Sequence, residues 1–60
     1  MQYLIFDIFD QFLKIFPEEA SNVLTYRSHG KNTIAIWFRT GLPVLFTFSN
    51  EEEWILTPYY

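Results

Sequence analysis

Large apolar and polar side chains recur with the period of an α-helix over residues 3–16, YLIFDIFDQFLKIF. At about 100° per residue, charged and amide side chains fall on one stripe and large apolar side chains lie opposite. The polar stripe is Asp7, Asp10, Gln11, Lys14 and Glu18, and the apolar side is Ile5, Phe9, Phe12 and Phe16. Pro17 disfavours α geometry at Phe16, so the pattern predicts an amphipathic helix that ends there or gives way to a separate turn through Glu18 and Glu19.

The apolar arc of this predicted helix is wide. Five further apolar residues extend it to about 200° of the circumference by the same angular count. They are Leu4, Phe6, Ile8, Leu13 and Ile15. One sheet covers less than this arc, so either the helix lies in a deep groove or its second flank contacts another subunit.

After residue 22 the apolar period changes to two, and β-branched and aromatic residues become frequent. This pattern predicts antiparallel strands separated by turns, two of which contain Gly30 and Gly41. The predicted strands are Val23–Arg27, Thr33–Arg39, Val44–Phe48 and a short Trp54–Thr57. We therefore expect an α+β fold in one domain, residues 1–60, with the N-terminal amphipathic helix packed on a three- to four-stranded antiparallel β-meander.

Alternation within the predicted strands assigns their side chains to two faces of the sheet. The residues expected to face the helix are Ile34, Ile36, Phe38, Phe46 and Phe48. The opposite face then carries Trp37 and Leu45, together with either Trp54 or Ile55. Polar side chains flank these residues: Thr25, Arg27, Thr33, Arg39 and Thr47. This face is the best candidate for a binding surface.

Aromatic residues make up 22% of the 60 residues, which is a large share for so short a chain. A chain of this length buries only about 60% of the surface that it exposes when unfolded, whereas each large ring can bury roughly 150–250 Å². The chain has no cysteine and one histidine, His29, so a disulfide framework and an ordinary zinc site are excluded. We therefore expect some aromatic surface to contact another chain, with a homodimer as one outcome.

The net charge of −3 disfavours binding driven by contacts to nucleic-acid phosphates. Trp37, Arg27 and Arg39 are residue types found on stacking platforms for single-stranded nucleic acid. Tryptophan and arginine also anchor protein interfaces. The excess of seven acidic over four basic residues favours a protein partner over nucleic acid. Asp7 and Asp10 interrupt the apolar N-terminal stretch, which indicates neither a signal peptide nor a membrane span, so we expect a cytoplasmic protein.

The segment LFTFSNEEEWIL places three consecutive acids between two apolar runs. Ser49–Glu52 matches a capping box that would start one helical turn, and it equally fits a four- or five-residue hairpin loop. The functional alternative is that Glu51, Glu52 and Glu53 present a negative surface to a basic cleft on a partner.

The sequence contains no recognisable set of catalytic residues. No cysteine nucleophile exists, and the two glycines, eleven residues apart, cannot form a phosphate-binding loop. His29 lies in a predicted turn, where a lone histidine is typically a solvated polar residue. Asp7 and Asp10 lie on a solvated helix stripe, where nothing would give the two carboxylates separate acid and base roles. We expect neither enzymatic activity nor a cofactor.

In general style, a small, acidic, aromatic-rich α+β chain without cysteine resembles the inhibitors that phages and mobile elements direct against host defence or DNA-repair enzymes. The resemblance rests on no motif and assigns no residue roles. The leading hypothesis is a protein-binding inhibitor in which Trp37, Leu45, Trp54 and Tyr59 anchor the partner beside Arg39, and Glu51, Glu52 and Glu53 form an acidic rim. The alternatives are a structural homo-oligomerisation or accessory module and, less favoured, a single-stranded nucleic-acid binder.

Overall fold

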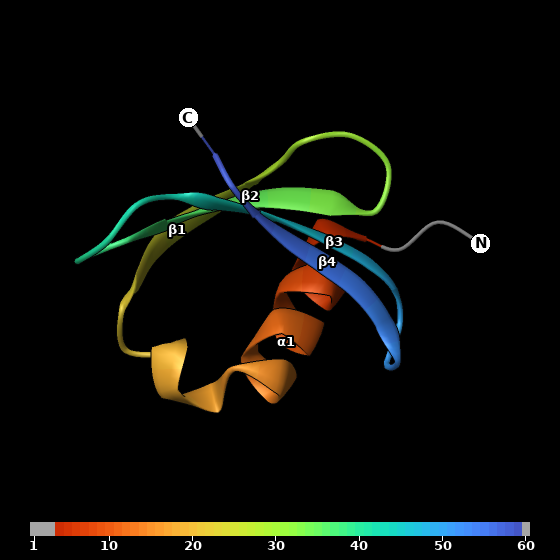
Figure 1. The fold of residues 1–60 in the computed structure, drawn as a ribbon, viewed down its shortest axis with the longest axis horizontal. Coiled ribbons are helices and arrows are strands. Elements are labelled where there is room, and N and C mark those ends of the chain that lie inside the picture. The colour runs from red at the N-terminus through yellow and green to blue at the C-terminus, as the bar shows by residue number, and fades with distance from the viewer. Residues whose placement is uncertain (1–3, 60) are drawn as a thin grey trace.

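The computed structural model of the chain describes residues 4–59, in which one helix packs against one face of a four-stranded antiparallel sheet (Figure 1). The elements are α1 (Ile5–Ile15), the 3₁₀ helix η1 (Pro17–Glu19), β1 (Val23–Ser28), β2 (Thr33–Phe38), β3 (Val44–Asn50) and β4 (Glu53–Pro58). The strands lie in the sheet in chain order, β1-β2-β3-β4. The predicted α+β meander is therefore confirmed, with four strands.

Helix α1 ends where the sequence predicted. The N–H of Phe16 donates to the carbonyl of Phe12 at 2.8 Å, and η1 begins at Pro17 with the N–H of Glu19 donating to the carbonyl of Phe16 at 3.0 Å. The fully buried side chains of the helix are Ile8 and Phe12. Ile5, which the pattern places on the apolar side of the helix, is exposed at the first position of α1. The expected helix began at residue 3, which lies outside the described residues.

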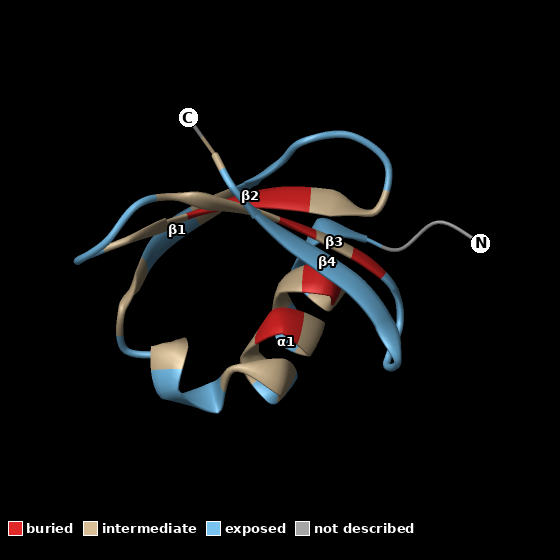
Figure 2. Cartoon of the chain, in the orientation of Figure 1, coloured by how far each residue is buried: buried red, intermediate tan, exposed pale blue. Residues whose placement is uncertain are grey.

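The core lies between α1 and the two central strands, β2 and β3. Its buried members are Ile8, Phe12, Ile34, Ile36, Phe46 and Phe48. Phe38 is half-buried and packs against this cluster, so all five sheet residues predicted to face the helix do so. Figure 2 shows the buried positions on the facing sides of α1, β2 and β3.

Two turns have the conformations that their glycines permit. Gly30 has φ 101° and Gly41 has φ 93°, a region that residues with a Cβ rarely adopt. The β3–β4 turn contains only Glu51 and Glu52, because β3 continues to Asn50 and β4 begins at Glu53. Of the two expected structures, the hairpin is therefore the correct one, with a shorter loop than predicted.

Asn50 explains why this loop is short. Its Oδ1 accepts a hydrogen bond from the N–H of Glu52 at 2.9 Å, and its Nδ2 donates to Oε1 of Glu53 at 3.1 Å. An asparagine side chain that bonds to the backbone two residues onward mimics a backbone turn. The pairing register also shifts between Phe48 and Asn50, so one extra residue is accommodated in β3.

The helix covers the sheet unevenly. It packs mainly against β1, β2 and β3, and all six residues of β4 are exposed (Figure 2). Strand β4 nevertheless pairs with β3 along its whole length, from Asn50 opposite Glu53 to Val44 opposite Pro58. The strand is thus held by its backbone ladder and projects beyond the area that α1 shields.

A candidate protein-binding surface on the sheet

The face of the sheet that points away from α1, here called the outer face, is covered by no element within residues 4–59 (Figure 1). Directly opposed residues share a face. One row across the outer face is Arg27, Ala35, Leu45 and Thr57, and a second is Thr33, Thr47 and Ile55. Trp37 lies on this face opposite Thr25. The structure thus places Trp37 and Leu45 where the sequence predicted.

Three rings meet on the outer face and form what is here called the ring cluster: Trp37, Tyr59 and His29. The centroid of the Tyr59 ring lies 5.8 Å from that of Trp37, at 74° between the ring planes. It lies 5.1 Å from that of His29, at 65°. These are edge-to-face contacts, the arrangement that the ring quadrupole favours. The N–H of Tyr59 donates to the carbonyl of Pro43 at 2.9 Å, which fixes the backbone beneath the ring.

The middle of the outer face is closely packed although no helix or strand of residues 4–59 lies above it. Ala35 is only 1% exposed, because the larger side chains around it close over its methyl group. Trp37, Leu45 and Tyr59 are each half-buried. The outer face therefore presents a half-buried centre of apolar and aromatic side chains, with threonine side chains and Arg27 around it.

A hollow of about 400 Å³ adjoins Trp37 at the β1 side of the outer face. It is lined by Leu24, Thr25, Arg27 and Trp37. The register of β1 shifts between Val23 and Thr25, and Leu24 at this irregularity is exposed. Sequence reasoning missed Leu24, since an irregularity that depends on strand pairing breaks the period of two without leaving a mark in the residue pattern.

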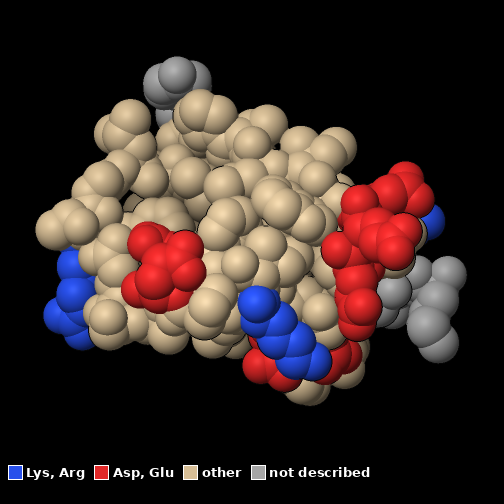
Figure 3. Space-filling model, turned by 60° about the horizontal axis from the view of Figure 1, so that its bottom comes forward, with Lys and Arg blue, Asp and Glu red and all other residues tan. Residues whose placement is uncertain are grey.

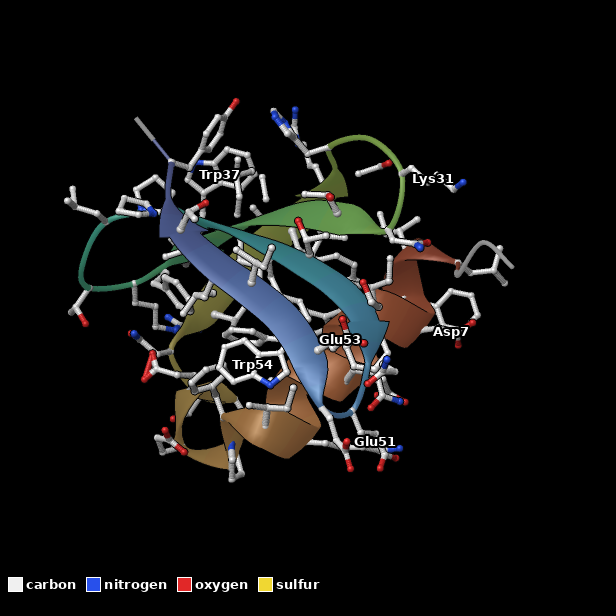
Figure 4. All side chains as sticks on the ribbon, turned by 45° about the vertical axis from the view of Figure 1, so that its right-hand side comes forward. Asp7, Lys31, Trp37, Glu51, Glu53 and Trp54 are labelled. Carbon is white, nitrogen blue, oxygen red and sulfur yellow. The ribbon has the colours of Figure 1, made fainter. Side chains whose placement is uncertain are left out.

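The acidic rim lies at the tip of the β3–β4 hairpin. Glu51, Glu52 and Glu53 are all exposed there, and Glu51 and Glu53 are labelled in Figure 4. Glu53 also accepts the hydrogen bond from Asn50, so the rim has a structural role in the turn as well as a negative charge. Figure 3, turned so that the α1 side comes forward, shows separate groups of acidic side chains, with a mostly uncharged tract between the left and right groups and a basic side chain at the lower edge.

Trp54 does not belong to the ring cluster. It lies opposite Phe48 and therefore on the α1 side of the sheet, and Figure 4 shows the two tryptophans on opposite sides. Its ring centroid is 5.2 Å from that of Phe16 and 6.0 Å from that of Phe46. Of the two candidates for the outer face, Ile55 is the correct one, so the four predicted anchors are divided between two surfaces.

Arg39 lies just after β2 and is exposed. Its backbone N–H donates to the carbonyl of Asn22 at 2.7 Å. The side chain of Asn22 holds the same junction, since its Oδ1 accepts from the N–H and the Oγ1 of Thr40, at 3.3 and 3.2 Å. The structure thus fixes the backbone at Arg39 and leaves its side chain exposed beyond the end of β2.

Within residues 4–59, no three histidine, cysteine or acidic side chains are grouped so that they could hold a metal ion. Nor does any helix in that range combine the length and the apolarity that a membrane crossing requires. Comparisons of the chain with family models, with curated proteins and with solved structures find no match.

Proposed function

We propose that this chain is a non-enzymatic protein-binding module that docks the outer face of its sheet on a larger protein. The observation that carries the proposal is the ring cluster of Trp37, Tyr59 and His29 on a sheet face that no described helix or strand covers. Tryptophan, tyrosine and arginine are the residues that most often dominate binding energy at interfaces. The three rings already contact one another in the single chain, and such prior contacts reduce the conformational entropy lost when a partner binds.

The hollow beside Trp37 indicates what the partner presents. Leu24 and the indole of Trp37 supply apolar walls, and Arg27 supplies a guanidinium at the edge. This combination suits one large apolar side chain that projects from the partner with a carboxylate next to it. An exposed ridge with that pair of side chains is the complementary feature that we expect.

The acidic rim gives the module its inhibitory mode in this proposal. Glu51, Glu52 and Glu53 are exposed on a short hairpin that can enter a basic groove, such as one that otherwise holds nucleic acid. Charges at the edge of an interface mainly raise the association rate. The target would then be a nucleic-acid-handling or defence protein, and the module would act in the cytoplasm.

The docking surface is tested by affinity capture from a lysate of the source cells, with wild-type chain and matched variants. Trp37→Ser removes the centre of the ring cluster, whereas Leu42→Ser removes an apolar side chain that is 69% exposed in the β2–β3 loop. We expect one protein to be retained by the wild type and by Leu42→Ser and lost with Trp37→Ser. Equal retention by all three chains would overturn the proposal.

The acidic rim is tested by association kinetics with the captured partner. Glu51→Gln with Glu52→Gln removes two charges and leaves the Glu53 contact to Asn50 in place. Asp10→Asn with Glu18→Gln removes the same charge from exposed positions on α1 and η1. We expect the first pair to slow association and to flatten its dependence on salt concentration, and the second pair to change neither. The same rates for both pairs would remove the steering role.

A second candidate function is self-assembly, in which the exposed apolar surface serves only copies of the same chain. The specific observation in its favour is the free edge of β4, where all six residues are exposed. A chain with this function would form an oligomer and retain no other protein in the capture experiment.

A further inference from the structure

The outer edge of β4 carries backbone groups that no described strand uses. Strand β4 is last in the sheet and pairs with β3. The N–H of Tyr59 donates to the carbonyl of Pro43, and hydrogen-bonded residues alternate along an antiparallel pair. Thr57 and Ile55 therefore bond to β3, whereas the N–H and C=O groups of Trp54 and Leu56 point away from the sheet.

The middle of this edge, residues 54–56, carries apolar side chains on both faces of the sheet. Trp54 and Leu56, on the α1 side, are 37% and 38% exposed, and Ile55, on the outer face, is 61% exposed. No charged residue lies between Glu53 and Pro58. Bulges and charges are the usual features that prevent an edge strand from pairing with another chain.

The opposite edge of the sheet has both of these protective features. Strand β1 contains the irregularity between Val23 and Thr25, and it carries Arg27. A second strand laid along β1 would meet a distorted backbone and a cation. Of the two edges, β4 is therefore the one that is suited to pairing.

The flank of α1 beside β4 is also open. A groove of about 240 Å³ lies there, lined by Phe12, Phe16, Phe38, Val44 and Leu56, with Glu18 and Glu19 at its margin. Leu56 belongs both to the groove and to the free edge. A chain that pairs with β4 would thus shield apolar surface on the α1 side in addition to forming backbone hydrogen bonds.

We propose that β4 pairs antiparallel with β4 of a second copy of this chain, across a two-fold axis at Ile55. In this register Trp54 lies opposite Leu56 of the second copy, and the same pair recurs on the other side of the axis. Each such pair exchanges both of its backbone hydrogen bonds, so every outward N–H of Trp54 and Leu56 has an acceptor. The two sheets join into one continuous sheet with both helices on the same face.

Neighbouring registers are less favourable. With the axis at Leu56, Trp54 would lie opposite Pro58, which has no N–H to donate. With the axis at Trp54, Glu52 and Glu53 would move against Leu56 and Ile55 of the second copy, which removes carboxylates from water without a partner. With the axis at Ile55, Glu53 instead lies opposite Thr57, whose hydroxyl can donate to the carboxylate across the junction.

This match between the strand and its own reversed copy is the reason to assign the edge to a second copy rather than to an unrelated protein. It also predicts the strength of association. An edge junction of this kind buries less than about 1,200 Å², the range of weak and transient contacts. The dimer should therefore form and dissociate with protein concentration in the micromolar range.

The register is tested by charge exchange at Ile55, a position whose exposure lets it accept charged side chains. Because Ile55 lies opposite itself, Ile55→Lys alone and Ile55→Glu alone each place two like charges together in the dimer. We expect each to raise the dimer dissociation constant at least about tenfold, since opposed residues of a non-hydrogen-bonded pair have the closest side chains. An equimolar mixture of the two variants should restore dimerisation, as measured by sedimentation equilibrium.

Leu24→Lys is the matched control, since Leu24 is similarly exposed on the other edge. It should leave the dissociation constant unchanged. Amide hydrogen exchange gives an independent readout, because the Trp54 and Leu56 amides should exchange more slowly as concentration rises while that of Leu24 does not. A wild-type chain that stays monomeric at millimolar concentration, equal effects of Ile55→Lys and Leu24→Lys, or a mixture that fails to dimerise would each overturn the proposal.

The inference is independent of the function proposed for the outer face. Trp37→Ser should abolish partner capture without altering dimerisation, and Leu56→Pro should remove the outward N–H at that position without breaking the bonds to β3. Loss of dimerisation in Leu56→Pro but not in Leu56→Ala would support backbone pairing at this edge. Equal loss in both variants would contradict it.

Discussion

Phe46 and Leu56 lie directly opposite each other on the same face of the sheet, yet Phe46 is fully buried and Leu56 is 38% exposed. The next pair on this face, closer to the β3–β4 turn, behaves in the same way. Phe48 is buried, and Trp54 opposite it is exposed. Both pairs share the same backbone ladder. The difference arises because α1 lies over β2 and β3 and does not extend over β4 (Figure 2).

This contrast separates two things that are often treated as one. Hydrogen-bonded pairing with β3 suffices to make β4 a strand, while burial requires a second layer above it. Helix α1 is 11 residues long and packs mainly against β1, β2 and β3, so β4 extends beyond it. The uncovered strand is a structural element that is available for contact with another chain.

The largest effect is expected from substitution in the covered region. Phe46→Ala removes a side chain that contacts the rings of Phe12 and Phe48 and should cost about 3–5 kcal/mol. Leu56→Ala, directly across the ladder, should cost about 1 kcal/mol or less, because its side chain already meets water. Urea unfolding at concentrations below self-association measures both. Similar losses would show that coverage by α1 does not set the contribution of these positions.

A smaller effect is expected at the boundary between the two regions. Trp54→Ala removes ring contacts with Phe16 and Phe46, each worth about 0.5–1.5 kcal/mol. The unfolding free energy should therefore fall by about 1–3 kcal/mol. Trp54→Phe should recover most of this loss, since a smaller ring still reaches both neighbours. No recovery would mean that the indole acts through something other than these contacts.

A still smaller effect is expected at the turn that positions β4. Asn50→Ala removes the hydrogen bonds to Glu52 and Glu53 and should cost about 0.5–1.5 kcal/mol. The thermal midpoint should drop by on the order of 5 °C, as followed by circular dichroism. Asn50→Asp keeps the acceptor for the Glu52 N–H but turns a carboxylate toward that of Glu53, so it should recover little of the loss at neutral pH. An unchanged midpoint for Asn50→Ala would show that the backbone hydrogen bonds between β3 and β4 suffice to form this turn.

The smallest effect is expected on the outer side of β4. Ile55→Thr replaces a side chain that is exposed in the monomer with another β-branched residue, and should change the unfolding free energy by less than about 0.5 kcal/mol. Denaturant unfolding of the dilute protein measures this. A loss as large as that of Trp54→Ala would place Ile55 in a packed environment and contradict its assignment to an uncovered face.

Much of the candidate surface could be predicted from the alternation of side chains within a strand. The pattern places Trp37 and Leu45 on the outer face because their positions relative to Ile34, Ile36 and Phe46 depend only on a local period of two. Trp54 could not be placed in this way. The face on which Trp54 lies depends on the register between β3 and β4. The shift between Phe48 and Asn50 adds one residue to β3, and this extra residue exchanges the two faces for the β4 residues paired beyond it.

The sequence by itself determined the kinds of element, their order and the inward face of β2 and β3, because helical and extended periods are properties of neighbouring residues. Only the tertiary structure decided that Tyr59 lies against Trp37 and His29, that Leu24 lines a hollow beside Trp37, and that α1 does not extend over β4. Each of these depends on residues far apart in the chain coming together. Such contacts are set by strand register and by the reach of one helix, neither of which leaves a periodic trace in the sequence.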